Sequence, residues 1–278
     1  MTFELKRVEL KQGPIHYRDV GTGPVMVFVH GLLVNGRLWE PVLERLSKTH
    51  RCIAPDWPIG AHSEPMHENA DLSSFGLARL IADFLEALDL RDVTLVGNDS
   101  GGALSQFTVV RHPERIKKLV LTTCDAFEVF PPLAFRYLVV VAKLPDAVMA
   151  LLANSMKWVT PLRRLPIAYG DLTRKRLSDE LIDAWAKPAL DSRIRRDTTK
   201  FLRSIEPREL IEAAAQLKNF KGDVHLIWTP EDKYFPVSLA HRLKEQLPGA
   251  KLDLISDAQV FVAIDQPDRL AELLASGF

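Results

Sequence analysis

The sequence has little of several features that identify a protein at once. It has only two cysteines, Cys52 and Cys124, which are too few for a disulfide framework; each lies beside an apolar run typical of a strand, so we expect both to be buried and reduced. No apolar stretch reaches the length of a membrane span, and the charged start MTFELKRVELK lacks the apolar core of a signal peptide. We therefore expect a cytoplasmic protein without a membrane partner.

Net charge is also missing, because 36 basic residues balance 36 acidic ones. This balance gives no indication of nucleic acid as a partner, and a small-molecule substrate bound by a monomer or homodimer fits better. The histidines are scattered without the spacing of metal ligands, and GNDSGG (97–102) lacks the Gly-Lys-Ser/Thr ending of a phosphate loop. We expect neither a metal nor a cofactor.

Short apolar runs alternate with amphipathic helical patterns through the first 124 residues. Strands are expected at 25–31, 51–56, 92–97 and 116–124, and helices at 36–47, 74–89 and 100–112. Near-continuous apolar strands separated by helices are typical of a doubly wound, mostly parallel sheet, which is an α/β fold class.

The alternation stops after Cys124 and returns near residue 223. The intervening residues are helical in pattern and are broken by prolines, among them Pro131, Pro145 and Pro188, which predicts an inserted helical lid at 125–215. Strands at 223–228 and 251–256 and helices at 236–247 and 267–276 follow. The core is therefore predicted to comprise 1–124 and 216–278.

The stretch LVGNDSGG (95–102) holds two candidate nucleophiles, Asp99 and Ser100, where a strand meets a helix. A nucleophile at such a turn needs small residues two positions before and after it. Asp99 has Gly97 and Gly101 at these positions, whereas Ser100 would have Asn98 and Gly102. The glycine spacing favours Asp99.

The strand-to-helix turn at Asp99, here called the elbow, is one of several family features in the chain. The others are His30-Gly31, the lid, WTPEDKYFP (228–236) and FVAIDQPDRL (261–270). With them the chain resembles the α/β-hydrolase superfamily over essentially its whole length. An aspartate at the elbow is similar to the branch that contains haloalkane dehalogenases and epoxide hydrolases, whereas esterases and lipases carry serine there. The resemblance implies an acid at Asp232 and an oxyanion hole formed by the backbone N–H groups of Leu32 and Ser100.

The chain departs from the superfamily at one catalytic position. Relatives carry a histidine just before the phenylalanine that corresponds to Phe261, but Val260 occupies this position and no histidine follows His241. A serine nucleophile needs a base from the first step, whereas an ionised aspartate can attack carbon without one. We therefore expect Asp99 to open an electrophile and to form an ester, without the usual base that hydrolyses this ester.

Further residues are candidates for the substrate pocket. His30, Trp57 and His62 lie in loops at the carboxyl edge of the predicted sheet, and His62 is the better substitute base, although an ordinary loop histidine is the alternative. Val260 and Phe261 are placed in the pocket by the resemblance.

Two lid tyrosines bear on the choice of substrate. Related epoxide hydrolases use cap tyrosines to protonate the opening oxygen, a role open to Tyr137 and Tyr169, with packed aromatics as the alternative. Halide-binding relatives carry Trp after the nucleophile and Asn or Trp after His-Gly. The chain has Ser100 and Leu32 there, which favours epoxide opening over dehalogenation.

Two other functional classes stay open. A ligand-binding or regulatory protein could retain the fold after losing turnover, and an esterase acting through Ser100 is a weaker alternative. Residues 136–200 carry thirteen basic and seven acidic residues, a net charge of +6. This charge predicts either attraction of an anionic substrate or an ordinary solvated surface.

Overall fold

One eight-stranded sheet forms the centre of the computed structural model, which describes residues 3–247 and 249–276. Its strands run in the order β1-β2-β4-β3-β5-β6-β7-β8, with β3 to β8 parallel and β1 and β2 antiparallel at one edge. The bounds are β1 Leu5–Leu10, β2 Gly13–Val20, β3 Val25–Val29, β4 Arg51–Pro55, β5 Val93–Asp99, β6 Ile116–Cys124, β7 Asp223–Trp228 and β8 Lys251–Leu254. The predicted α/β fold with a mostly parallel sheet is confirmed.

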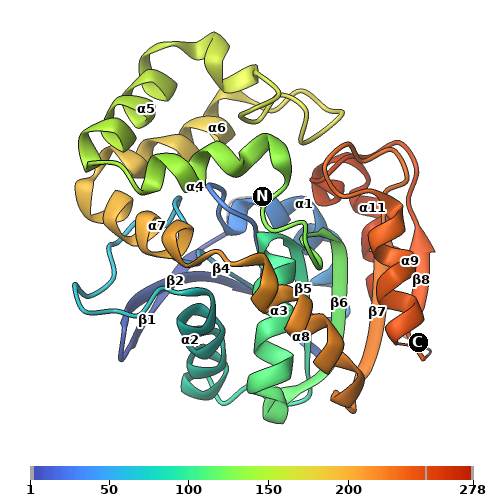
Figure 1. Ribbon diagram of the computed structural model, residues 1–278. Helices are drawn as coiled ribbons and strands as arrows, with labels where there is room; N and C mark the ends of the chain where they lie inside the picture. The colour runs from blue at the N-terminus through green and yellow to red at the C-terminus, as the bar shows by residue number, and fades with distance from the viewer. Residues whose placement is uncertain (1–2, 248, 277–278) are drawn as a thin grey trace.

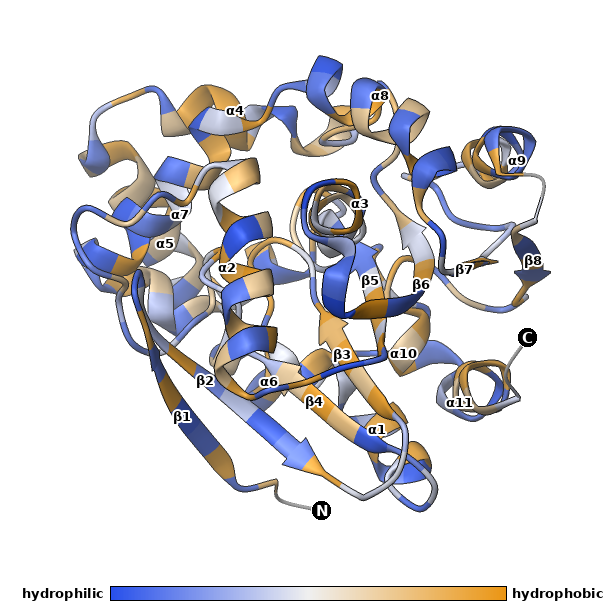
Figure 2. Cartoon of the chain, turned by 90° about the horizontal axis from the view of Figure 1, so that it is seen from below, coloured by the Kyte–Doolittle hydropathy of each residue, from blue (hydrophilic) through white to orange (hydrophobic). Residues whose placement is uncertain are grey.

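Helices cover both faces of this sheet. One layer contains α2, α3, α8 and α9, and the other contains α1, α10 and α11 (Figures 1 and 2). Their bounds are α1 Glu40–Leu46, α2 Ser74–Ala87, α3 Ser100–Arg111, α8 Pro207–Gln216, α9 Val237–Gln246, α10 Val262–Asp265 and α11 Pro267–Ala275. The helix predicted at 36–47 is divided into a 3₁₀ helix and α1, because Pro41 favours the first turn of a new helix.

A group of helices lies over the end of the sheet where β5 meets α3 (Figure 1). These helices are α4 Arg136–Ala142, α5 Asp146–Trp158, α6 Asp179–Ala186 and α7 Ser192–Ser204. The next helix, α8, packs against α3 within the core layer. We therefore propose that the lid ends near Ser204, one helix earlier than the sequence pattern predicts.

Candidate active site

The turn between β5 and α3 is centred on Asp99. Asp99 has φ 54° and ψ −134°, a backbone conformation that is costly for a residue with a side chain, whereas Ser100 is already the first residue of α3. A Cβ added at Gly97 would lie 2.5 Å from Ser105 Oγ, and one added at Gly101 would lie 2.2 Å from the carbonyl oxygen of Val29. The glycines at both positions are therefore required by close packing.

The carboxylate of Asp99 lies among backbone groups of the loop after β3. The N–H groups of Ser100 and Leu32 face it. A Cβ added at Gly31 would lie only 2.0 Å from Asp99 Oδ2, so this loop reaches the carboxylate because residue 31 has no side chain. The two N–H groups expected to form an oxyanion hole thus lie beside the candidate nucleophile.

Burial raises the pKa of the Asp99 carboxyl group to about 7. The N–H groups of Ser100 and Leu32 lower it, and the nearby charge of Asp232 raises it further. At pH 7 about half of the Asp99 side chains are therefore protonated. The surroundings of Asp99 therefore disfavour the ionised form, which is the form that attacks carbon.

Asp232 follows β7 and is held by one of its two carboxyl oxygens. Oδ1 accepts the N–H groups of Tyr234 at 2.7 Å and Phe235 at 2.6 Å. Oδ2 is buried and has no hydrogen-bond partner within the described part of the chain. Burial raises the pKa of this carboxyl group to about 6. An oriented carboxylate with one unused oxygen is the arrangement that positions a catalytic histidine.

Val260 lies in a segment that is hydrogen-bonded both to Asn98, beside the candidate nucleophile, and to Glu231, beside Asp232. Its carbonyl oxygen accepts the Asn98 side-chain N–H at 2.8 Å, and the amide of the preceding Gln259 donates to the carbonyl of Glu231 at 3.0 Å. The Val260 side chain is fully buried. The two histidines predicted near the site bind other groups: His30 contacts Gly31 and Trp57, and His62 contacts Asp197. Val260 does not line the described cavity wall, in contrast to its predicted place in the pocket, and its aliphatic side chain cannot accept a proton.

An apolar cavity of about 110 Å³ lies between the elbow and the lid. Four predicted site residues line it besides Asp99, namely Leu32, Ser100, Tyr137 and Tyr169. Most of the remaining wall is aliphatic or aromatic and includes Phe135, Met149, Leu152, Met156, Trp185 and Phe235. Such a wall suits a small molecule with little polarity.

His30 and Trp57 belong to the core and not to the cavity wall. His30 Nδ1 lies 2.8 Å from the carbonyl oxygen of Gly31, and its Nε2 accepts the Trp57 N–H at 2.8 Å. Burial lowers the pKa of His30 to about 4, so the ring is neutral. The Trp57 indole donates to the carbonyl of Phe28 and packs edge-on against Phe84. These hydrogen bonds hold both residues in the core, so they do not line the described cavity wall as the sequence predicted.

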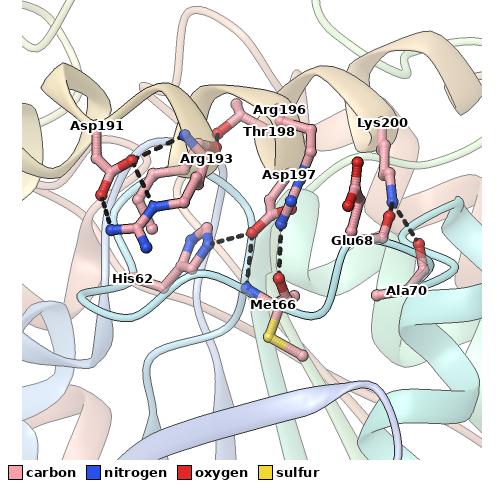
Figure 3. Close-up of polar contacts among 11 residues, drawn as sticks. His62, Met66, Glu68, Ala70, Asp191, Arg193, Arg196, Asp197, Thr198 and Lys200 are labelled. Carbon is pink, nitrogen blue, oxygen red and sulfur yellow. Dashed lines mark hydrogen bonds and ion pairs between the residues drawn. The ribbon is translucent and has the colours of Figure 1, made fainter.

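His62 contacts the lid and does not line the described cavity wall. Its Nε2 lies 3.3 Å from Oδ2 of Asp197 on α7, as Figure 3 shows. Asp197 also accepts the Met66 N–H at 2.8 Å and pairs with Arg196. This cluster joins α7 to the loop that precedes α2, so a structural role for His62 fits better than that of a substitute base.

The two lid tyrosines line the cavity, but their phenol groups are engaged. Tyr137 donates to the carbonyl of Ile167 and Tyr169 to that of Leu33, both at 2.8 Å. Burial raises the pKa of both phenols. A tyrosine that protonates a substrate would first have to release its carbonyl partner.

Phe261 lies behind the cavity wall. Its N–H donates to the carbonyl of Leu172 at 2.8 Å, and its ring packs against Trp185 with 5.6 Å between centroids. Trp185 itself lines the cavity. Phe261 therefore supports the wall and is not part of the described lining.

The cation in the described cavity wall is compensated, although the lid as a whole keeps its net positive charge. Each of its seven acidic residues forms an ion pair. Arg195, the cation in the described cavity wall, binds Asp146 and donates to the carbonyls of Ala189 and Leu190. These contacts favour the solvated-surface interpretation over attraction of an anionic substrate into the cavity.

Asp125 is a titratable residue at the elbow that the sequence analysis did not identify. It directly follows β6 and is fully buried. Its carboxyl group lies near the Ser100 hydroxyl, but neither carboxyl oxygen is satisfied by a hydrogen bond within the described chain. Burial and the charge of Asp99 raise its pKa well above the usual range. The signal was an acidic residue at the end of the strand next to β5.

Replacement of Asp99 by asparagine is expected to stabilise the protein at alkaline pH. Since the pKa of Asp99 is raised on folding, its contribution to stability is present at acidic pH and is lost as pH rises through about 7. Asp99→Asn should raise the free energy of unfolding by about 1–3 kcal/mol at pH 8 and change it little at pH 4. Urea unfolding at both pH values measures this difference, with exposed Asp223→Asn as the control. A variant less stable than wild type at pH 8 would contradict the burial argument.

Comparison with known proteins identifies chains that are similar to this one. A family model described as alpha/beta hydrolase fold matches residues 24–267. Haloalkane dehalogenase 2 of Mycobacterium tuberculosis is 26% identical, with 99% of this chain and 95% of the relative covered. Cis-3-alkyl-4-alkyloxetan-2-one decarboxylase of Shewanella oneidensis is 24% identical, with 92% and 82% covered. The crystal structure of a putative ancestral haloalkane dehalogenase superposes with a TM-score of 0.79 at 20% identity, covering 98% of this chain and 97% of the other.

Proposed function

Because the chain belongs to the alpha/beta hydrolase fold family, we propose that it is an enzyme whose Asp99 carboxylate attacks an electrophilic carbon of a small, largely apolar molecule. The observation that carries this proposal is the elbow, where the strained turn falls on Asp99 and Ser100 already belongs to α3. The adjoining apolar cavity supports the substrate class. The position of Ser100 also argues against an esterase that uses this serine.

The first step forms one carbon–oxygen bond and breaks one bond to the leaving group. One oxygen of Asp99 attacks carbon, and the electron pair of the broken bond leaves on a halide or on the ring oxygen of an epoxide, which then takes up a proton. The N–H groups of Ser100 and Leu32 hold the other carboxylate oxygen, which becomes the carbonyl oxygen of the ester. The same groups would stabilise negative charge on this oxygen during hydrolysis.

Within this class we favour epoxide opening over dehalogenation. Tyr137 and Tyr169 lie in the cavity wall, where an opening epoxide needs a proton donor, and either phenol would serve as this donor after releasing its carbonyl partner. The indole N–H of Trp185 is taken by Asn35 Oδ1 at 3.1 Å, so it does not offer a site for a halide. The name of the Shewanella relative adds a strained oxetan-2-one ring as a third electrophile for testing.

Hydrolysis of the ester is expected to be slow, because Val260 cannot accept a proton and Asp232 Oδ2 has no partner to orient. The same observation favours one second candidate, a binding protein that retains its ligand without turnover. The two candidates differ in a single respect, namely whether a covalent bond to Asp99 forms.

Covalent labelling distinguishes these candidates. We expect intact-mass measurements after incubation with an alkyl epoxide, a bromoalkane and a dialkyl oxetan-2-one to show one retained adduct per chain, with peptide mapping placing it on Asp99. Asp99→Asn should abolish the adduct and retain ligand binding, whereas the matched variant Ser100→Ala should retain the adduct. An adduct on Ser100, or one that persists in Asp99→Asn, refutes the assignment. Binding without any adduct supports the binding protein.

A further inference from the structure

Helix α5 of the lid is apolar on both of its faces. Its inner face, which includes Met149, Leu152 and Met156, lines the cavity. On the outer face, the side chains of Leu151 and Trp158 are 71% and 73% exposed. Large apolar side chains of a surface helix normally face the core, yet these two are exposed on a helix at the outer edge of the lid (Figure 1). Its outer face therefore lacks a cover.

The exposed apolar side chains concentrate in this part of the chain. Nine of the twelve exposed large hydrophobic residues within the described chain lie between residues 133 and 167. These nine residues, here called the lid patch, are Leu133, Val140, Leu144, Val148, Leu151, Trp158, Val159, Leu165 and Ile167. Helices α4 and α5, which carry several of them, pack against each other. Such a concentration of apolar surface indicates an interaction site.

Positive charge accompanies the lid patch. Arg136, Lys143 and Lys157 have no ion-pair partner within the described chain, and the Lys157 amine lies 4.6 Å from the centroid of the Trp158 ring. The acidic residue of α5, Asp146, is paired with Arg195. The patch thus combines aliphatic residues, an exposed indole and uncompensated cations.

We propose that the lid patch docks on the surface of an anionic lipid bilayer. Apolar side chains, tryptophan and lysine together suit the boundary between headgroups and acyl chains, where cations bind anionic headgroups. A second copy of the chain fits less well, because a two-fold interface on this patch would gather two sets of three unpaired cations into one contact surface. None of the described helices is long and apolar enough to cross a bilayer, so α5 would lie on the surface.

This inference revises the sequence-based expectation of no membrane partner, and it does not depend on the chemistry at Asp99. The helices that carry the lid patch also line the cavity with their inner faces. An apolar molecule dissolved in the bilayer would therefore meet the protein on the side where the cavity wall is formed. Docking would let such a molecule enter the cavity directly from the bilayer, where it is more concentrated than in water.

Vesicle sedimentation tests the proposal with the full chain. We expect binding to vesicles of phosphatidylcholine mixed with phosphatidylglycerol, weaker binding to phosphatidylcholine alone, and a loss of affinity as salt rises. The double variant Lys143→Glu/Lys157→Glu should weaken binding to the mixed vesicles about tenfold or more. Leu151→Ser/Trp158→Ser should weaken binding at both lipid compositions. Because these side chains are exposed, we expect the variants to fold, and circular dichroism checks this.

Matched controls lie on the core. Ile211→Ser/Leu254→Ser removes two exposed hydrophobic side chains, and Lys221→Glu reverses an exposed charge; both should bind like wild type. Absence of binding to the mixed vesicles overturns the proposal, as does equal weakening by the core variants. If light scattering shows a dimer that Leu151→Ser/Trp158→Ser dissociates, a second copy covers the patch and the lipid proposal is wrong.

Discussion

Val260→His is expected to raise the steady-state turnover of an epoxide by about 10²–10⁴-fold over wild type, which is the usual contribution of a positioned base. The new imidazole would enter between the Asp99 turn and Asp232, because the hydrogen bonds of Asn98 and Gln259 fix this segment there. Asp232 Oδ2, now without a partner, would accept its N–H and hold the other ring nitrogen free for water. Wild type should stop after one covalent event per chain or turn over very slowly.

The measurement is product per enzyme against time, together with urea unfolding of each variant. A buried ring left unpaired would cost about 1–3 kcal/mol of stability. Val260→Ala is the matched control, because it supplies space without a base and should give no gain. Asp232→Asn in the Val260→His background should remove most of the gain. If wild type turns over rapidly through Asp99, another base exists; His62→Ala then identifies or eliminates that histidine.

The residues that set local geometry were predictable from the sequence. The bounds of β6 and β7 agree with their predicted ranges, because each strand contains a short run of large apolar residues between helical segments. The glycines at 97 and 101 indicated where the turn would fall, since close packing leaves no room for a side chain. The hairpin of β1 and β2 received no predicted range, because charged and polar residues interrupt both of its strands.

Roles that depend on contacts across the fold were less predictable. The sequence placed His30 and Trp57 at the correct edge of the sheet, but it could not show that they bond to each other. It could not show that α7 supplies Asp197 to His62. The raised pKa of Asp99 follows from burial and from a neighbouring acid distant in the sequence. Spacing along the chain reports none of these contacts.

The rate of alkylation at Asp99 is expected to rise roughly 100-fold between pH 5 and pH 8. Only the ionised carboxylate attacks carbon, and a pKa of about 7 leaves about 1% of it ionised at pH 5 and about 90% at pH 8. Because burial raises the pKa of Asp99, the alkylation rate should fall as the pH falls through about 7. Single-turnover mass spectrometry with a bromoalkane measures the rate, because the reactivity of this probe does not depend on its own protonation.

Asp232→Asn provides the matched test of this pH dependence. The charge of Asp232 raises the pKa of Asp99, so its removal should move the midpoint of the rate profile to lower pH. Exposed Asp223→Asn should leave the midpoint in place. A rate that is constant from pH 5 to pH 8, or a midpoint near 4 in wild type, would show that Asp99 is as well solvated as an ordinary surface carboxylate. In that case desolvation would not govern the reactivity of Asp99. Its pKa would not be raised, and the ionised carboxylate would not lower the free energy of unfolding at alkaline pH.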